Sequence, residues 1–319
     1  MLFYLIVVSV ILIIALLVAW ICLNNIYLPI VDFTPLLNTK NNSIFPLTSE
    51  QTLNKIKDNR NNKYKYKNKN KYKIALISLS VGDGREFAEA SKKRLYQYAD
   101  IHGYTLEYFD QTIDKNYSPM WQKVLAVKNV LNKNIYDYVV WVDDDIYITN
   151  TSFKIEDFIN LTDKPIIMSR DRFTNDANLY INSGIYILKT NKIGKRFIQE
   201  TIDNYNLMNG SFKYYIFHEQ SVMTYLYFVK YYRNIEVLPF NVLQSFNELA
   251  EAKELYEFYH LISSDILESK SWREGDFTIH FAGVTREKRN YLMPKLLGKD
   301  KYINVNGIEY PITIQSWNK

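Results

Sequence analysis

Hydrophobic residues follow three different patterns along the 319 residues of the chain. Residues 2–23, LFYLIVVSVILIIALLVAWICL, are almost entirely apolar and carry no charge, residues 24–73 are polar, and the remainder alternates between strand-like and helix-like spacing. As a helix, the first segment would measure about 33 Å, close to the thickness of a membrane core. It exceeds the apolar core of a signal peptide, and no small-residue cleavage site follows it. The pattern therefore predicts an uncleaved transmembrane signal anchor over residues 2–23.

Residues 24–73 form a low-complexity segment rich in Asn, Lys and Tyr that ends in NRNNKYKYKNKNKYK. Interleaved lysine and tyrosine can bind nucleic acid or anionic lipid. The same composition suits a solvated spacer, which we favour because Asn, Lys, Ile and Tyr are frequent throughout the chain. We therefore predict a basic stem and expect no nucleic-acid partner. Most of the net charge of +5 comes from this stem, so that charge says little about a substrate.

From residue 74 onward, short β-branched runs alternate with segments of helical spacing. The pattern predicts strands at 74–80, 104–109 and 136–142 and helices at 85–103 and 119–134. Gly103 is typical of a helix end, and Ser118 and Pro119 are typical of a helix start. This β-α-β-α-β order predicts an α/β fold whose sheet begins with parallel strands flanked by helices. We expect residues 74–319 to form one such domain.

Three adjacent carboxylates, Asp143, Asp144 and Asp145, follow the third predicted strand in the stretch YVVWVDDDIYITN. Ligands of such sheets bind beyond the carboxyl ends of the strands, so the cluster would lie at the rim of a ligand cleft. In extended backbone, Asp143 and Asp145 would point the same way and Asp144 elsewhere. Carboxylate oxygens suit Mg²⁺ or Mn²⁺, which can bridge the oxygens of a diphosphate. An acidic loop without a metal is the alternative for this motif taken alone.

Polar residues also interrupt three later segments. These are NLYINSGIYILKTN with Asn182–Gly184, FHEQSVMTYLYFVKYY with Glu219 and Gln220, and FTIHFAG with His280. Glycine in a strand often allows a ligand to approach closely. A lone histidine near a core strand is more often structural, but beside two convergent carboxylates His280 would complete a site suited to Mn²⁺. For His102, at a predicted helix C-terminus, a structural role is sufficient.

Taken in order, these segments resemble glycosyltransferase family 34, which contains α-galactosyl, α-xylosyl and α-1,6-mannosyl transferases. The resemblance runs from KKRLYQYADIHGYTLEY through MWQKVLAVKNVL, VVWVDDDIYIT, INSGIYILKTN and EQS to HFAG, and it covers most of residues 74–290. It implies a GT-A fold, which is a Rossmann-like mixed sheet flanked by helices. It also implies a UDP- or GDP-sugar donor, Mn²⁺ or Mg²⁺ as the metal, retention of anomeric configuration, and a glycan or glycoprotein acceptor for the hexose or pentose.

The resemblance assigns roles to the acidic cluster and its surroundings. Asp143 and Asp145 match the two metal ligands of the family's D-x-D motif, and His280 matches the third ligand. Asp144, at the middle position, would face the ribose or the sugar. Lys123 matches the lysine of a W-x-K segment and would contact the donor phosphate.

The later segments match the remaining donor-binding and catalytic positions. Asn182 and Gly184 match the family's L-N-T-G segment on the donor side. Glu219 and Gln220 match an acidic-Gln-Ser segment near the reacting sugar, where they would stabilise an oxocarbenium-like sugar. His218 precedes Glu219, whereas the plant members have a second acid there.

A second departure follows HFAG. The chain continues with Val284 and Thr285, where a Cys-Lys pair is often found. One phosphate contact of the family is therefore missing at this position. Arg286 or Lys288 could replace it.

The resemblance also implies a type II membrane topology. The only cysteine, Cys22, lies in the predicted anchor, so cysteine usage does not indicate the compartment. Few charges flank the anchor, because Asp32 precedes the first lysine, Lys40, and the positive-inside signal is weak. We expect a single-pass protein with its catalytic domain in the lumen of the Golgi or the ER.

Two other functions are compatible with parts of the pattern. A phosphatase could use D-x-D as nucleophile and acid, but that motif normally follows the first strand and continues with Thr or Val, whereas Tyr147 stands here. A non-catalytic, membrane-tethered protein could bind glycans or lipid through its stem or some of its 27 tyrosines. At the C-terminal end, YINVNGIEYPITI predicts a hairpin that turns at Asn306 and Gly307.

Overall fold

The computed structural model of the chain describes residues 48–63, 72–172, 179–205, 218–247, 271–305 and 307–313. The predicted anchor over residues 2–23 lies outside these ranges, as does part of the predicted stem. Within the described ranges, no helix combines the length and the apolar character that a membrane span requires. The strands and helices below all lie in one unit, residues 47–319.

The central sheet of this unit has the strand order β2-β1-β3-β6-β5-β7. Its members are β2 (Thr105–Phe109), β1 (Ile74–Leu79), β3 (Tyr138–Val142), β6 (Ile181–Lys189), β5 (Ile166–Arg170) and β7 (Ile235–Leu238). Strand β1 pairs in parallel with β2 and β3, as the β-α-β-α-β pattern predicts. Strand β6 runs antiparallel to both β3 and β5, while β7 is parallel to β5. The sheet is therefore mixed, and the predicted α/β fold is confirmed.

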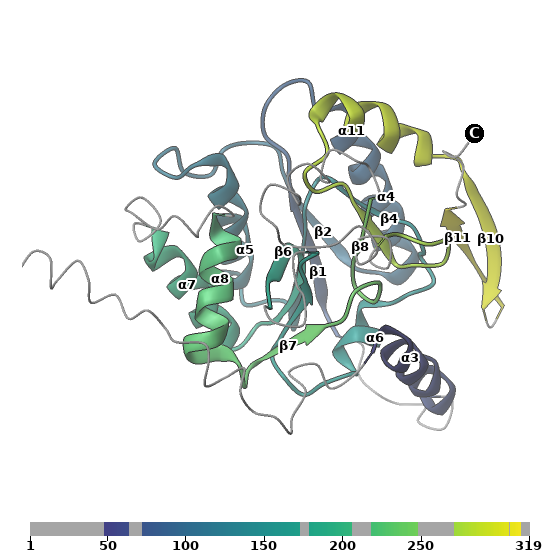
Figure 1. Cartoon of the computed structure of the whole chain (residues 1–319), viewed down its shortest axis with the longest axis horizontal. Coiled ribbons are helices and arrows are strands. Elements are labelled where there is room, and N and C mark those ends of the chain that lie inside the picture. Colours follow the sequence, from purple (N-terminus) through teal and green to yellow (C-terminus); the bar gives the residue numbers. More distant parts are fainter. Residues whose placement is uncertain are drawn as a thin grey trace, which may run out of the picture. The chain divides into compact units, whose positions relative to one another are not determined.

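Helices cover both faces of this sheet (Figure 1). One face carries α5 (Gln122–Asn132), α7 (Lys192–Asp203) and α8 (Glu219–Leu226), and the other carries α4 (Glu86–His102) and α6 (Ile155–Ile159). Alternate residues of β1 show why both faces must be covered. Ala75 and Ile77 belong to the core beneath α5 and α7, whereas Ile74 and Leu76 belong to the core beneath α4 and α6. A strand that is apolar on both faces is typical of such a buried sheet.

A small second sheet begins where β3 ends. It consists of β4 (Ile146–Ile148), β9 (Thr278–His280) and β8 (Ser245–Phe246), with β9 in the middle. Strand β9 runs antiparallel to β4 and places His280 opposite Ile146. Only residues 143–145 separate β3 from β4, so this pairing brings the distant His280 beside the acidic turn.

Part of the predicted stem is a helix, α3 (Ser49–Lys63), that packs on α6. Ile56 is 1% exposed in this contact. The guanidinium of Arg60 donates to Asp157 Oδ2 at 2.6 Å and to the Ser152 carbonyl at 3.0 Å. Residues 49–63 therefore belong to the folded unit, because Leu53 and Ile56 pack against its core and Arg60 reaches α6 and the loop before it.

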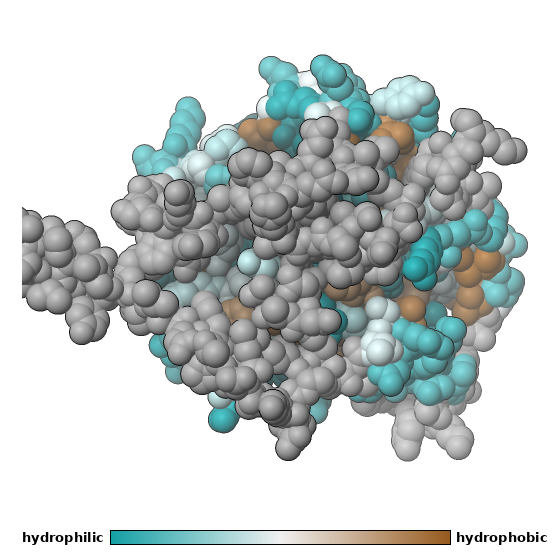
Figure 2. Space-filling model, in the orientation of Figure 1, coloured by the Kyte–Doolittle hydropathy of each residue, from teal (hydrophilic) through white to brown (hydrophobic). Residues whose placement is uncertain are grey.

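The predicted C-terminal hairpin is confirmed as β10 (Asp300–Val305) and β11 (Ile308–Thr313), with Val305 opposite Ile308. Helix α11 (Arg286–Leu292) and a short helix, Met293–Leu296, lead into it. The described surface on the side shown in Figure 2 is mostly hydrophilic, with some hydrophobic colour over the hairpin. Exposed apolar side chains of the hairpin include Tyr302 and Ile308.

The start of the second predicted helix differs from the expectation. Residues Pro119–Trp121 form a 3₁₀ turn before α5, and the Ser118 side chain makes no capping hydrogen bond. Instead, the Trp121 N–H donates to the Ser118 carbonyl at 2.9 Å. Ser118 is thus the residue before the first helical turn and Pro119 begins that turn, as predicted, but the Ser118 side chain does not cap it.

Candidate functional site

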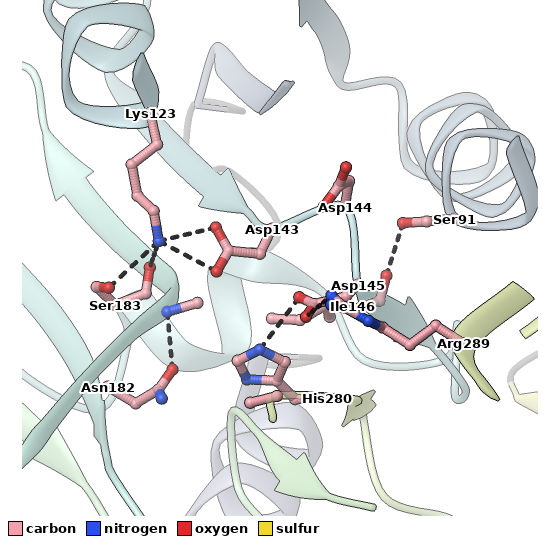
Figure 3. A network of polar contacts seen from close by, with 12 residues as sticks. Ser91, Lys123, Asp143, Asp144, Asp145, Ile146, Asn182, Ser183, His280 and Arg289 are labelled. Carbon is pink, nitrogen blue, oxygen red and sulfur yellow. Dashed lines mark hydrogen bonds and ion pairs between the residues drawn. The ribbon is translucent and has the colours of Figure 1, made fainter. Parts of the chain in front are cut away.

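The three adjacent aspartates form a tight turn instead of extending β3. The Ile146 N–H donates to the Asp143 carbonyl at 3.1 Å, and the Asp143 N–H donates to the Gly184 carbonyl at 2.8 Å. The expectation of extended backbone is wrong at this point. The turn nevertheless directs Asp143 and Asp145 inward while Asp144 points away from both, as Figure 3 shows.

Asp143, Asp145 and His280 form a possible metal site. One potential ligand atom of each residue lies within 4.8 Å of the other two. His280 Nε2 faces Asp145 Oδ1 at 3.2 Å, and its ring is buried, with 3% of the residue exposed. The other ring nitrogen of His280, Nδ1, has no hydrogen-bond partner within the described part of the chain.

Asp143 is held from the side of α5. Trp141 Nε1–H donates to Asp143 Oδ1 at 2.7 Å, and the Lys123 ammonium lies 2.9 Å from the same oxygen. Burial raises the pKa of the Asp143 carboxyl to about 6. The negative charge of Asp145 raises this pKa further, and the positive charge of Lys123 lowers it. Asp143 is thus a carboxylate whose negative charge is only partly compensated by the protein.

Asp144 is bound by Arg85, which precedes α4. The guanidinium donates through Nη2 at 2.5 Å and through Nε at 3.1 Å, and Nε also lies 3.2 Å from Ser80 Oγ. Burial and the neighbouring Asp145 raise the pKa of Asp144, and Arg85 opposes this shift. The Arg85 guanidinium also lies over the Phe87 ring, 5.0 Å from its centre.

A second arginine, Arg289 of α11, binds Asp145. Its Nη1–H donates to Asp145 Oδ2 at 2.7 Å, and its guanidinium lies 4.9 Å from the centre of the Phe87 ring. Its buried Nε has no hydrogen-bond partner among the described residues. Burial alone would raise the pKa of Asp145. Contact with His280 and Arg289 nevertheless holds this pKa well below its usual value.

Arg289 is therefore the basic residue after HFAG that reaches the acidic site, whereas the sequence suggested Arg286 or Lys288. The residues named there as possible replacements for a lysine, Arg286 and Lys288, are exposed. Arg286 approaches the backbone of the loop after β1, because its Nη1 lies 3.5 Å from the Asp83 carbonyl. Arg286 and Arg289 lie three residues apart and so share one side of the short helix, where Arg289 reaches Asp145 and Arg286 reaches the Asp83 carbonyl.

Strand β6 is irregular where NSG interrupts its apolar residues. Ile167 of β5 pairs with Ile187, but Ser169 pairs with Asn182, so one β5 residue, Met168, faces four on β6. Such bulges re-aim side chains and are frequent beside active sites. Here the extra residues lie at 183–186, next to the acidic turn.

Gly184 leaves room for the imidazole of His280. A Cβ added to Gly184 would lie 2.5 Å from His280 Cε1 and 2.9 Å from His280 Nδ1. No side chain fits at these distances, so the position requires glycine for as long as the ring stays in place. The expected close approach at Gly184 is therefore made by a protein side chain.

Glu219 begins α8 and points into the same region. It is 3% exposed, its Oε1 lies 2.9 Å from the Lys123 ammonium, and it accepts a hydrogen bond from Ser183 Oγ at 3.0 Å. The preceding His218 has a φ of 52°, a backbone conformation that is rare outside glycine. Strained residues of this kind cluster at functional sites.

Gln220 and Asn182 meet at a further carboxylate, Asp171. Gln220 Nε2 and Asn182 Nδ2 donate to Asp171 Oδ2 at 3.2 and 2.7 Å. Gln220 Oε1 accepts the Ser183 N–H at 3.0 Å, and Asn182 Oδ1 accepts the Gly184 N–H at 2.7 Å. The two amides are therefore oriented by a buried acid that sequence motifs did not indicate.

The structure gathers the residues singled out in the sequence around one site, with Asp144 turned to its own partner. These are Lys123, Asp143, Asp144, Asp145, Asn182, Gly184, Glu219, Gln220 and His280. Sequence reasoning missed Arg85, Asp171, Ser183 and Arg289. Arg85 and Asp171 stand outside any recognisable motif, and Arg289 is one of several basic residues in VTREKR. Only the fold distinguishes them from surface charges.

The residues present fit a divalent first-row metal. Two carboxylate oxygens and one imidazole nitrogen are a donor set that suits Mn²⁺ better than Ca²⁺. The imidazole is held by packing against Gly184 rather than by a hydrogen bond at Nδ1. The three ligands leave further coordination positions for a substrate.

Residues 78–176 match the model of the galactosyl transferase GMA12/MNN10 family. The comparison with curated proteins found no match. Among solved structures, the chain is similar to a glycosyltransferase involved in the glycosylation of the major capsid of PBCV-1. The two are 17% identical, the match covers 70% of this chain and 99% of that one, and the TM-score is 0.51. This likeness shows a fold of the GT-A type.

Two further structures match at lower TM-scores. The galactosyltransferase LgtC, solved in complex with donor and acceptor sugar analogs, is 10% identical, with 70% of this chain and 96% of that one covered and a TM-score of 0.42. The glycosyltransferase GlyE of Streptococcus pneumoniae TIGR4 is 15% identical, with 77% and 66% covered and a TM-score of 0.45.

Proposed function

From the match of residues 78–176 to the galactosyl transferase GMA12/MNN10 family and the geometry of the site, we propose a membrane-anchored, Mn²⁺-dependent sugar transferase. It transfers a hexose or pentose from a nucleoside diphosphate sugar to a glycan or glycoprotein and retains the anomeric configuration. One observation carries the proposal. Asp143, Asp145 and His280, from two distant parts of the chain, converge beside the buried Glu219 and the half-buried Gln220.

Asp143, Asp145 and His280 would hold the metal ion. A bound Mn²⁺ supplies positive charge that offsets the negative charge developing on the diphosphate as the glycosidic bond breaks. The protein contributes the arrangement of the ligands: Trp141 holds Asp143, and contact with Gly184 fixes the imidazole.

Arg85 and Arg289 are the cations that bind the diphosphate of the donor. Their side chains are 25% and 22% exposed, so both can be reached from solvent. Both guanidinium groups lie over the ring of Phe87, within 5.0 Å of its centre. Arginine suits phosphate because its planar group donates two parallel hydrogen bonds. Arg289 thereby replaces the lysine that the family often has after HFAG.

Asp144 and Asn182 lie beside the donor. When the diphosphate binds Arg85, the Asp144 carboxylate is released to accept hydrogen bonds from ribose or sugar hydroxyls. Asn182, fixed by Asp171, presents its amide from the bulge of β6, and Gly184 keeps the backbone close to His280. These contacts orient the donor.

Glu219 and Gln220 face the reacting sugar. As the glycosidic bond breaks, positive charge develops at the anomeric carbon, and a carboxylate nearby stabilises it. Ser183 fixes both side chains, since its Oγ–H donates to Glu219 and its N–H donates to Gln220. A carboxylate on the face opposite the leaving group is compatible with retention.

The membrane location rests on the sequence. Residues 2–23 form the proposed anchor, and the catalytic unit lies on the luminal side of the Golgi or ER membrane. The helix α3 packs on this unit, so its connection to the membrane is shorter than the whole segment 24–73.

The test uses the full-length chain in detergent with Mn²⁺ and a panel of UDP- and GDP-sugars. Nucleotide release from one donor, lost with a chelator and in Asp145→Asn, is the expected result and identifies the sugar. If Asp145→Asn transfers at the wild-type rate, the assignment of the site is wrong. If no donor turns over and neither Mn²⁺ nor nucleotide binds, the chain is a tethered binding protein instead.

A further inference from the structure

Lys123 is the most enclosed cation of the site. Its side chain is 11% exposed, and its ammonium lies 2.9 Å from both Asp143 Oδ1 and Glu219 Oε1. The third contact is with Ser183, whose Oγ and carbonyl lie at 3.3 and 3.4 Å. An ammonium has three N–H donors. Since carboxylates on two sides and Ser183 on the third accept them, Lys123 has no donor left for a diphosphate.

The position of Lys123 also separates it from the two arginines. In Figure 3 its ammonium lies between Asp143 and Ser183, on the opposite side of Asp143 from Arg289. Burial lowers the pKa of Lys123, but Asp143 and Glu219 more than compensate, so its pKa lies above the usual value. The residue is therefore a permanent, enclosed cation, whereas the arginines at the rim remain accessible.

We propose that Lys123 is a positioning residue that couples the metal site to the catalytic carboxylate by sharing one ammonium between Asp143 and Glu219. The proposal rests on the proposed function, because it takes Asp143 as a metal ligand and Glu219 as the group facing the sugar. Lys123 holds the Glu219 carboxylate in the orientation that the transition state requires. It acts through Glu219 and touches neither the donor nor the metal.

This arrangement has an unusual consequence for metal affinity. Lys123 and a divalent cation compete for the negative charge of the same carboxylate, Asp143. Removing the ammonium leaves Asp143 held by Trp141 alone, with its charge available to the metal. Mn²⁺ should therefore bind more tightly without Lys123, although the transfer reaction becomes slower.

Replacing Glu219 with the neutral glutamine should act in the opposite direction. The ammonium of Lys123 would then direct its full attraction to Asp143. Mn²⁺ should bind more weakly in Glu219→Gln, although Glu219 is not a ligand of the metal. Opposite effects on Mn²⁺ affinity from two neighbouring residues distinguish competition for Asp143 from general disruption of the site.

The experiment measures Mn²⁺ binding to the full-length protein by calorimetry, without any donor sugar. In Lys123→Met we expect Mn²⁺ to bind about threefold to tenfold more tightly, the usual size of coupling between adjacent charged residues. In Glu219→Gln we expect weaker binding by a similar factor. Lys128→Met, on the same helix and partly exposed, is the control and should leave the affinity unchanged.

Two kinetic measurements complete the test. For Lys123→Met we expect kcat to fall about 100-fold with the donor KM nearly unchanged, as for a misplaced catalytic group. UDP and GDP should bind as they do to the wild type. Lys123→Arg keeps the positive charge and should recover part of kcat.

Two results would overturn the proposal. Weaker UDP or GDP binding in Lys123→Met would make Lys123 a diphosphate contact, as the family resemblance implied. Weaker Mn²⁺ binding in Lys123→Met would make it a support of the ligand set. If Lys123→Met does not fold, the proposal is tested by Glu219→Gln alone: weaker Mn²⁺ binding supports it, and unchanged or tighter binding contradicts it. Wild-type Mn²⁺ binding by Asp145→Asn would contradict the proposed function itself, whatever Lys123 does.

Discussion

Among the described residues, two buried polar clusters differ in how their charges are balanced. The first joins α4 to the C-terminal hairpin. There Arg94, 1% exposed, pairs with Asp300 at 2.6 Å, and His102 Nε2 lies 2.8 Å from the Thr151 carbonyl while its ring stacks on Tyr310. One cation meets one carboxylate, and the histidine has a fixed partner.

The second cluster is the acidic site, where carboxylates outnumber cations. Four carboxylates pair with three cations there, an excess of one negative charge among these side chains when His280 is neutral, and the buried Asp171 beside them is held by two amides. The carboxylates are Asp143, Asp144, Asp145 and Glu219, and the cations are Lys123, Arg85 and Arg289. Uncompensated buried charge is costly, and it is retained where a ligand completes it. The first cluster thus stabilises the fold, while the second prepares a binding site.

The largest expected effect is a loss of transfer activity that occurs only when the second cluster is changed. Asp143→Asn should lower the transfer rate by about 10³-fold, or about 4 kcal/mol, because the metal loses a charged ligand. Its thermal midpoint should be unchanged or higher, since one repulsive charge is gone. Both quantities are measured by donor turnover and thermal unfolding.

The matched control is Asp300→Asn in the first cluster. It should lower the thermal midpoint and leave kcat/KM unchanged, the reverse pattern. If Asp143→Asn lost stability and kept its activity, the acidic cluster would be structural as well.

The next effect is on stability. Arg94→Met should lower the free energy of unfolding by about 3 kcal/mol, because it leaves Asp300 partly buried without its partner. Urea unfolding measures this loss, and the kinetic constants of the folded enzyme should not change. Adding Asp300→Leu should recover part of the stability, since the unpaired charge is then removed as well. A neutral effect of Arg94→Met would show that this pair contributes nothing to the fold.

A smaller effect concerns the packing of His280. Gly184→Ala should weaken Mn²⁺ binding about tenfold to 100-fold, because the new methyl group would lie within 2.5 Å of His280 Cε1 and displace the ring. Calorimetric titration with Mn²⁺ measures the change. In a His280→Ala background the same substitution should have no further effect. An additional loss there would mean that Gly184 acts through the backbone at Asp143.

Hydrophobic periodicity predicted the framework of the fold well. The strands β1 and β3 follow it closely because each is a continuous buried run, and the helix α4 follows it because its buried residues recur at helical spacing and it ends at Gly103. The antiparallel direction of β6 was not predicted, since a strand pattern does not encode the direction of its pairing. Nor was the helix α3, which has a single fully buried apolar residue, Ile56, in a polar segment.

The acidic site was predicted in its motifs but not in its supporting contacts. Asp143 and Asp145 were recognisable because three adjacent aspartates follow a buried strand at the edge of the sheet where ligands bind, and because later segments match the same family. Arg289 and Asp171 were not, since their roles depend on where α11 and the end of β5 place them. The turn at 143–145 also could not be foreseen, because it forms when β4 pairs with β9, more than a hundred residues away.

The smallest expected effect is the pH dependence of stability that the buried His102 of the first cluster causes. Burial and the nearby Lys154 lower the pKa of His102, so the folded state binds this proton less readily than the unfolded chain. Its contribution to stability is therefore present above the unfolded pKa of about 6.5 and is lost as the pH falls below it, by at most about 1.4 kcal/mol per pH unit. His102→Gln cannot titrate but can still donate to the Thr151 carbonyl. Urea unfolding at pH 7.5 and pH 5 should show a difference between wild type and His102→Gln that shrinks or reverses at the lower pH. A constant difference would mean that His102 binds its proton equally well in the folded and the unfolded state, so that burial does not lower its pKa.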